Sequence, residues 1–554
     1  MGWKKSKSGC CRAIERQVLF GKPWGLNPFA SKCAASRNLQ ELRGGFSTSS
    51  DSPILLPPPD PTLSACGKGE RGTCYPLSAI SQLPALSILR LTPEEDFTAA
   101  KRSKTKREAN AMSSTPTEGS TEKTTEAAPA AEIEGLQGQP LWHRLWGYAR
   151  LTGPGYLQSA LTLGSGTASA CLLAGANYGY SLLWLQPLSM VLGIIILSAI
   201  AHQTLIAQER PYRVFWTRLH PSLAILWGLS ALLASIIWHF PQYSLAGSVI
   251  RDWGELAGVA ISPWLFAPLL LAFAIFISWS YARGSRGVRL YERLLKYMVW
   301  GILLALALVV VKTGVNWGAL ARGFLVPTLP RDPRGLTVVL GALGATVGIN
   351  MVFLYPYSLL RRRWSKPHLE LAYFDLWTGM FLPFTIATSL LIVATANTLY
   401  GTDTEVKGAL EVAQILTPII GLATARAIMG LGLLAMALST ITLHMLASGF
   451  IVCEMLGKPL EGWPYRLAML VPIVGVLGVI YELPFWLGVL TSSICLLLMP
   501  AIYVCFLVLH NSTAYLGADK PTGRRAWLWN AGLGLVIGVI TFAAASRIWS
   551  LIRP

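Results

Sequence analysis

Charge is scarce in this chain, and it is missing from the middle of its longest apolar runs. Only 13% of the 554 residues are charged and 53% are hydrophobic, whereas soluble domains carry about 25% charged residues. Acids are scarcer than bases, 28 against 46, and the 14 acids after residue 140 fall in loops or near the ends of apolar runs. This balance excludes a protein that folds alone in water.

Sequence signals for enzymatic chemistry are also missing. The chain carries no nucleotide-binding loop, no nucleophile motif and no cluster of metal ligands, so we expect neither an enzyme nor a cofactor. Its nine cysteines form no CxxC pair, which argues against a zinc site or a disulfide framework. The net charge of +18 comes largely from short loops between apolar runs, as membrane topology requires, so we expect a lipid bilayer and no nucleic acid as partner.

Apolar runs fill the chain from about residue 152 to 548, and each is long enough to cross a hydrocarbon core of roughly 30 Å. The sequence therefore predicts an all-α membrane protein with about eleven transmembrane helices. The expected spans are 153–177, 181–206, 222–248, 263–281, 293–313, 336–360, 376–397, 420–453, 466–481, 485–509 and 526–547.

Lys and Arg in the loops predict the orientation. The side shared with the N-terminal flank carries 18 of them and the opposite side carries 8. We call the first the Arg-rich side. Because basic loops stay in the cytoplasm, we expect a cytoplasmic N-terminus and an outside C-terminus, in the plasma membrane if the source is prokaryotic.

Residues 1–140 differ from the rest, because they are rich in Ser, Pro and Gly and have no sustained apolar period. Such a segment cannot bury a core, so we expect it to be disordered and expect residues 141–554 to form the membrane domain. Met112 lies just ahead of a polar tail, which favours residues 1–111 as a misassigned upstream extension. The alternatives are a myristoylation signal at Gly2 and a transit peptide up to Ser50.

Small residues interrupt two of the apolar runs in matching places of the two halves. An unwound backbone inside a bilayer is tolerated only where it faces protein or lines a cavity, and a pair of such breaks points to the substrate site of a transporter. The alternative is that the glycines only allow close helix packing. The candidate substrate-binding residues are Gly164, Ser165, Gly166 and Thr167 in the first break, and Gly348, Ile349, Asn350 and Met351 in the second.

Other polar residues inside the spans are weaker candidates. His239 and Gln242 flank Pro241, and with Tyr243 they could line a pathway or form helix–helix hydrogen bonds. His239 is the one we would test as a proton carrier. Ser492 could also line the site, whereas His202 and His444 fit better as structural histidines.

Several patches in one order resemble the natural-resistance-associated macrophage protein (Nramp) family of divalent metal transporters, over roughly residues 145–510. They are GPGYLQSALTLGSGTASACLLAGANYGYSLLW from residue 153, GVRLYE at 287–292, GATVGINMVFLYPYS at 344–358 and the span LGLLAMALSTITLHMLASGFIVCEML. The resemblance implies a LeuT-like fold of two inverted five-helix repeats, with broken first and sixth helices and one extra helix.

The resemblance fails at the family's DPGN and MPH motifs. Carried over by position, the family's metal-binding Asp and Asn fall on Gly164 and Thr167, its Met on Gly348 and the following His on Asn350. Its acidic pair for proton movement falls on Phe240 and Tyr243. The sequence leaves the metal ligands unknown.

The resemblance and the missing ligands together predict a secondary transporter that works by alternating access. A divalent ion without a carboxylate keeps a large desolvation penalty, so we expect a hydrated, Mg²⁺-like cation rather than Mn²⁺ or Fe²⁺. One alternative is a small neutral or zwitterionic solute such as an amino acid. Another is a membrane sensor or scaffold that no longer transports. The oligomeric state is not readable from the sequence.

Overall fold

The computed structural model describes residues 133–552 except 134, 137, 282–284, 402–420, 482 and 485. By its contacts the chain divides into two units, Met1–Pro116 and Thr117–Pro554, and every described residue belongs to the second. The expectations of disorder in residues 1–140 and of an upstream extension over 1–111 fall almost wholly outside the described residues, so they stay predictions.

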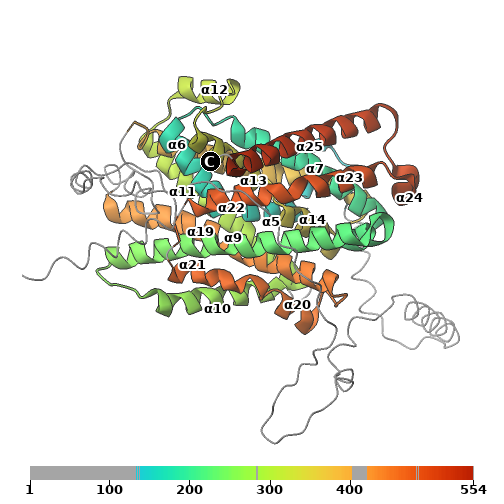
Figure 1. Cartoon of the computed structure of the whole chain (residues 1–554), viewed down its shortest axis with the longest axis horizontal. Helices are drawn as coiled ribbons and strands as arrows, with labels where there is room; N and C mark the ends of the chain where they lie inside the picture. Colours follow the sequence, from blue (N-terminus) through green and yellow to red (C-terminus); the bar gives the residue numbers. More distant parts are fainter. Residues whose placement is uncertain are drawn as a thin grey trace, which may run out of the picture. The chain divides into compact units, whose positions relative to one another are not determined.

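Helices make up the described part of the chain, and no strand occurs within it (Figure 1). In chain order the long helices and their short neighbours are α4 (Leu141–Leu151), α5 (Pro154–Thr162), α6 (Ser165–Tyr178), α7 (Leu185–Ala207), α8 (Pro211–Val214), α9 (Pro221–Leu256), α10 (Pro263–Tyr281), α11 (Ser285–Thr313), α12 (Trp317–Leu325), α13 (Pro333–Thr346), α14 (Ile349–Arg361), α15 (Leu369–Asp375), α16 (Leu382–Ala396), α19 (Leu422–Met455), α20 (Gly462–Ala468), α21 (Leu477–Ile480), α22 (Leu487–Cys495), α23 (Met499–His510), α24 (Thr513–Leu516) and α25 (Gly523–Ile552). Tighter or wider turns connect several of them: η4 (Phe215–Leu219), η5 (Lys366–His368), η6 (Leu376–Phe381), η7 (Val471–Val476), η8 (Leu496–Leu498) and η9 (Gly517–Asp519).

Local sequence explains where many of these helices begin. Proline is the first residue of α5, α9 and α13, among others, a position where its missing N–H costs nothing. Asp332 precedes α13, and its carboxylate accepts a hydrogen bond from the Gly335 amide at 2.8 Å. Asn316 caps α12 in the same way, accepting from the Ala319 amide at 3.0 Å.

The predicted spans match the helices. Ten described helices are long and apolar enough to cross a membrane, and a bent pair, α5 with α6, makes up to eleven. The bend between α5 and α6 is 55°. Spans and helices agree at most ends within a few residues, and the eighth expected span, 420–453, corresponds to α19 at Leu422–Met455. The prediction of an all-α membrane protein with about eleven spans is confirmed for the described residues.

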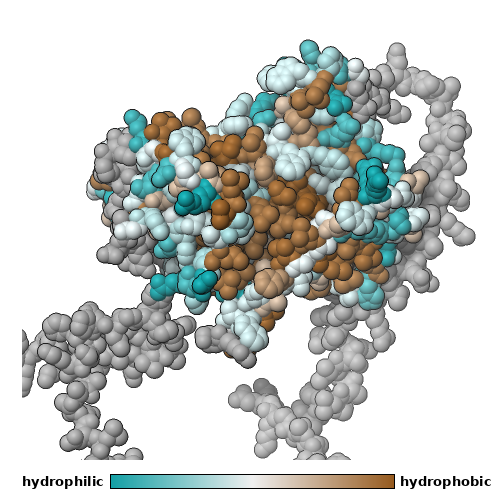
Figure 2. All heavy atoms as spheres, turned by 90° about the horizontal axis from the view of Figure 1, so that it is seen from above, coloured by the Kyte–Doolittle hydropathy of each residue, from teal (hydrophilic) through white to brown (hydrophobic). Residues whose placement is uncertain are grey.

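The broken helices lie at the centre of the helical packing. Across its apolar window the α13–α14 span is 83% buried, whereas α25 is only 28% buried. The helices α9 and α19 pack along each other, and both also contact α14. Large apolar side chains such as Leu269, Phe273 and Phe542 stay exposed on the outer helices, and Figure 2 shows a broad hydrophobic area with hydrophilic residues toward its edges. Such a surface is suited to lipid rather than to water.

Candidate substrate site between the helix breaks

A small cavity lies where the two helix breaks meet. Its volume is about 20 Å³, and holding one water takes roughly 10–15 Å³. In this conformation the cavity therefore has room for one water or one bare ion. The lining residues come from α5, α9, α13, α14, α19 and the two breaks, and they are Leu161, Thr162, Gly164, Trp238, Gly344, Ala345, Gly348, Asn350, Met351 and His444.

The first break is shorter than the sequence predicted. Only Leu163 and Gly164 lie outside the helices, whereas Ser165, Gly166 and Thr167 form the first turn of α6. The expectation of an unwound segment from Gly164 to Thr167 is wrong in extent, because two residues are enough to turn the chain by 55°. The carbonyl oxygen of Thr162 accepts hydrogen bonds from the Gly164 amide at 2.9 Å and from the Thr167 hydroxyl at 2.6 Å. Thr167 thus holds the break together and does not line the cavity.

Glycine is needed at Gly164 because of space. Its φ of −116° and ψ of −170° are open to any residue. A Cβ there would lie only 2.8 Å from the side-chain nitrogen of Gln242 and 2.8 Å from the hydroxyl of Thr440. At Gly166 a Cβ would lie 2.1 Å from the ring of Trp238. The glycines let α9 and α19 approach the break closely, which fits the packing interpretation, and Gly164, which lines the cavity, stays a predicted substrate-binding residue.

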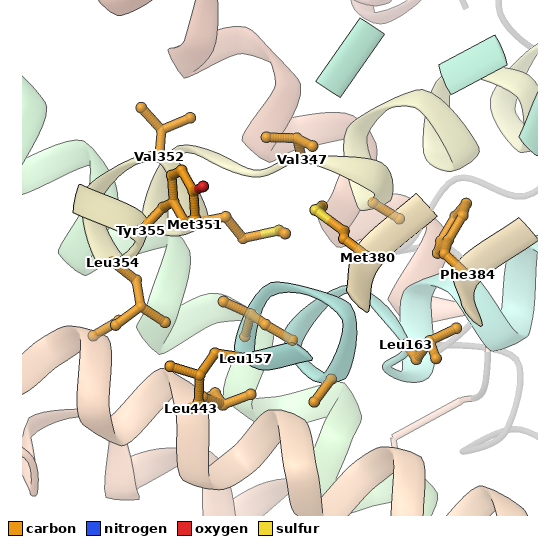
Figure 3. Packing of buried hydrophobic residues seen from close by; sticks show 14 of the residues in the cluster. Leu157, Leu163, Val347, Met351, Val352, Leu354, Tyr355, Met380, Phe384 and Leu443 are labelled. Atoms are coloured by element: carbon orange, nitrogen blue, oxygen red, sulfur yellow. The ribbon is translucent and has the colours of Figure 1, made fainter. Parts of the chain in front are cut away.

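The second break consists of Val347 and Gly348, both in extended conformation. Ile349, Asn350 and Met351 belong to the first turn of α14, so the second break is shorter than the expected interruption at Gly348, Ile349 and Asn350. The thioether of Met351 accepts hydrogen bonds from the Gly348 amide at 3.3 Å and from the Thr162 hydroxyl at 3.6 Å. Figure 3 shows Met351 reaching from α14 toward the space beside α5, the helix that carries Leu157. The sulfur of Met351 therefore lines the cavity. It comes from a residue three positions beyond Gly348, the position that corresponds to the family's Met.

Asn350 links the second break to α19. Its side-chain oxygen accepts from the Met351 amide at 3.0 Å, and its nitrogen lies 2.9 Å from Nδ1 of His444. Nδ1 therefore accepts, and in a neutral ring the proton of His444 sits on Nε2. Among the described residues, Nε2 of His444 has no hydrogen-bond partner. Of the second-break candidates, Gly348, Asn350 and Met351 line the cavity and Ile349 does not.

His239 lies beside the cavity without lining it. Both of its ring nitrogens contact backbone carbonyl oxygens, Nδ1 that of Pro472 and Nε2 that of Ile441 at 3.0 Å. A neutral imidazole has one N–H, so only a doubly protonated ring can donate to both. The centroids of the His239 and His444 rings are 5.9 Å apart.

The other predicted pathway residues support the first break. The side-chain oxygen of Gln242 accepts from the Ser165 amide at 2.8 Å, which satisfies a free amide at the start of α6. Ser492 donates to the Gly488 carbonyl at 2.7 Å and packs against Gly166. Tyr243 packs edge-on against His239 at 5.2 Å. None of these three lines the cavity.

Two acids are buried below the cavity, toward the Arg-rich side. Asp375 and Glu292 were expected near span ends, and their side chains are 0% and 3% exposed. Asp375 accepts from the amides of Gly153 at 3.1 Å and Gly155 at 2.6 Å, which caps the start of α5. Glu292 pairs with Arg362 at 2.6 Å. These carboxylates stabilise one end of α5, and neither lines the cavity.

Sequence reasoning missed four residues that shape the site: Thr162, Trp238, Thr440 and His444. Thr440 and His444 lie on α19, far from the breaks in sequence. The sequence around a single polar residue in an apolar run does not indicate which other helix that residue contacts. Only the packing of α19 on α5 and α9 reveals their place.

Comparison with known proteins agrees with this arrangement. Residues 155–550 match the sequence model of the family described as natural resistance-associated macrophage protein-like. A divalent metal cation transporter MntH of Agrobacterium fabrum is 25% identical over 342 residues, covering 58% of this chain and 71% of that protein. The MntH of Acidiphilium cryptum is 23% identical over 429 residues, covering 75% of this chain and 94% of its own.

Solved structures of the Eremococcus coleocola manganese transporter have the same fold. One of them superposes with a TM-score of 0.59 at 17% sequence identity and covers 75% of this chain and 90% of the transporter chain. At this identity the likeness concerns the fold alone. It confirms the LeuT-like arrangement with broken first and sixth helices that the resemblance implied.

Proposed function

Since the chain belongs to the natural resistance-associated macrophage protein-like family, we propose that this multi-pass membrane protein carries a metal cation by alternating access. The observation that carries the proposal is the meeting of two helix breaks at one buried cavity. In transporters with discontinuous helices, substrates bind where such breaks meet near the middle of the membrane. The relatives are divalent metal cation transporters and a manganese transporter, which supports a metal ion as substrate.

The chemistry of the helix ends favours a cation. The carboxyl ends of α5 and α13 point their carbonyl groups toward the breaks, and helix C-termini attract positive charge. The opposing amino ends of α6 and α14 would attract anions, but protein groups occupy part of their donors. Gln242 accepts from the Ser165 amide and Met351 accepts from the Gly348 amide.

Within the described lining no carboxylate is present, and this supports an ion that keeps part of its own hydration. A bare divalent ion among neutral ligands would retain most of its desolvation penalty, whereas Mg²⁺ usually keeps several of its waters when bound. We therefore propose a Mg²⁺-like cation ahead of Mn²⁺ and Fe²⁺. A hydrated ion needs more than 20 Å³, so this proposal requires the cavity to widen in the open states.

A soft cation is the second candidate, and the sulfur of Met351 and the imidazole of His444 favour it. Thioether and imidazole ligands suit ions such as Cu⁺, which needs less compensating charge than a divalent ion. A small neutral or zwitterionic solute is less well supported, because the relatives are divalent metal cation transporters and a manganese transporter.

Uptake by the purified full chain in proteoliposomes tests the proposal. We expect saturable uptake of Mg²⁺, reported by an internal indicator dye, and weak uptake of Mn²⁺. Saturable, high-affinity Mn²⁺ uptake would contradict the preference for a hydrated ion, and Cu⁺ uptake without Mg²⁺ uptake would favour the soft site. Binding of a metal without any flux would overturn transport and support a sensor.

The same proposal includes an orientation. The 18 basic loop residues on the Arg-rich side, against 8 on the other, support a cytoplasmic N-terminus and an outside C-terminus. In a prokaryotic cell the membrane would be the plasma membrane. Protease protection of tags placed at each end of the full chain in sealed vesicles checks this.

A further inference from the structure

Gln158 and Tyr355 are two buried polar side chains that the described structure leaves without partners. Both are 0% exposed. Among the described residues, the side-chain nitrogen and oxygen of Gln158 have no hydrogen-bond partner, and the hydroxyl of Tyr355 has none either. Buried polar groups are almost always paired, so each exception calls for an explanation such as a bound water or ion.

The two residues occupy corresponding positions on facing helices. At the level of the cavity α5 and α14 touch through the Thr162 hydroxyl and the Met351 sulfur, 3.6 Å apart. Gln158 lies four residues before Thr162 on α5, and Tyr355 lies four residues after Met351 on α14. Four residues make about one helical turn, which returns a side chain to nearly the same face. Because the helices run in opposite directions, both steps lead toward the Arg-rich side.

The next contact below them is a hydrogen bond from a charged side chain to the backbone. There Arg362, just beyond α14, donates to the carbonyl of Thr152, just before α5, at 3.5 Å. At the same level the carboxylate of Asp375 holds the Gly155 amide at 2.6 Å, three residues before Gln158. The unpaired side chains therefore lie between a contact at the cavity and a contact at the start of α5.

We propose that Gln158 and Tyr355, with the carboxylate of Asp375 below them, form a second cation station between the cavity and the Arg-rich side. This inference rests on the proposed cation transport. An amide oxygen, a phenol oxygen and a carboxylate are oxygen ligands of the kind that hydrated hard cations accept. In this structure Arg362 and Lys296 lie at this end of α5, Arg362 paired with Glu292 at 2.6 Å and Lys296 donating to the Thr152 hydroxyl at 3.3 Å.

The break supplies the movement that the station needs. The short helix α5 is joined to α6 only through Leu163 and Gly164. A tilt of α5 about this joint separates its Gln158 face from α14 and opens a polar space directly below the cavity. Because neither amide atom of Gln158 has a hydrogen-bond partner among the described residues, we infer that the polar side chain serves a ligand that enters when the helices part.

Three single variants of the full chain test the station. Gln158→Leu and Tyr355→Phe remove polar groups with little change in size, and Tyr465→Phe is the matched control. Tyr465 is also a fully buried tyrosine with no hydroxyl partner within the described part, but it lies on α20, away from α5 and α14. With Mg²⁺ as probe, we expect the first two to lower the uptake rate about 2- to 13-fold each, the range of one hydrogen bond. Equilibrium binding at the cavity and the rate of the Tyr465 variant should stay within about 2-fold of the parent.

A second measurement does not depend on the substrate. The Gln158→Cys variant should react with a membrane-impermeant thiol reagent applied from the Arg-rich side, above the background of the parent chain, and the Tyr465→Cys variant should not. If no metal is transported but position 158 is labelled, the proposed function fails and the route stands. If transport is unaffected in both variants and position 158 stays unlabelled, the station is wrong while the proposed function stands.

Discussion

At the scale of single residues, Gly164 has no room for a side chain. A Cβ would meet the side chains of Gln242 and Thr440 at 2.8 Å. We therefore expect Gly164→Val to abolish uptake while the protein still inserts into the membrane, because no charge is added. Gly538→Val on α25 is the control, since nothing lies within 4 Å of a Cβ there. Equal uptake by both variants would place the substrate site elsewhere.

Gly348 differs from Gly164. The only described atoms that a Cβ there would approach belong to the side chain of Asn350, at 2.7 Å, and that side chain can turn. We expect Gly348→Ala to keep measurable uptake and Gly348→Val to lose more, because a β-branched side chain is stiff at χ1. Metal uptake in proteoliposomes measures the difference, and a complete loss with Ala would contradict this account.

Polarity should matter at Thr167 and Asn350. Thr167→Val removes the hydrogen bond that holds the Thr162 carbonyl at the break, and Asn350→Leu leaves Nδ1 of His444 without its donor. A hydrogen bond is worth roughly 0.5–1.5 kcal/mol net, so each change should weaken metal binding about 2- to 13-fold. Titration of the purified variants measures this, and unchanged affinity in both would show that the breaks do not form the site.

The residue scale also marks the limit of what the sequence can predict. Gly164, Gly348, Asn350 and Met351 were predictable because glycines interrupt apolar runs in a repeated pattern. His444 was taken for a structural histidine, because nothing in the run around it tells which helix it faces.

At the scale of helices, the two breaks were predictable in position but not in length. Glycine and small residues indicate where a helix can open, yet hydrogen bonds decide how far it does. Three of them, at the Ser165 amide, the Thr162 carbonyl and the Gly348 amide, let α6 and α14 begin at once. Gln242, the partner of the Ser165 amide, comes from α9, 77 residues away, so no local window of the sequence contains it.

The start of α13 should respond to acid. The hydroxyl of Tyr178 donates to Asp332 at 2.7 Å, and together with the Gly335 amide it lowers the pKa of that carboxyl. A lowered pKa means that the stabilisation is present above the unfolded value, about pH 3.9, and is lost as the pH falls through the folded value. Asp332→Asn keeps a cap but cannot titrate. We expect the unfolding temperature of the parent to fall more than that of the variant between pH 6 and pH 3. An equal fall in both would contradict the assignment.

At the scale of the whole molecule, the length of the apolar runs was enough to predict the helices, because each span must cross the same thickness of hydrocarbon. The burial of Asp375 and Glu292 was not predictable in this way. Both stand at the edges of apolar runs, and only the packing of α5 against α11 and η6 encloses them. A charged residue at the end of a span can therefore be buried inside the protein.

The membrane region should be able to insert, fold and take up metal without residues 1–111. Residues 1–111 lack the apolar content to pack on the helices. We expect a chain that begins at Met112 to insert, to unfold at the same temperature as the full chain and to take up metal at the same rate. Size-exclusion profiles and thermal unfolding in detergent measure the first two, and proteoliposome uptake measures the third.

A further deletion to residue 152 is the matched control, because it removes α4, whose Tyr148 hydroxyl and Arg144 contact Glu370. If the Met112 chain fails to express or unfolds at a lower temperature while the full chain is stable, then the upstream segment packs on the membrane region and is no misassigned extension.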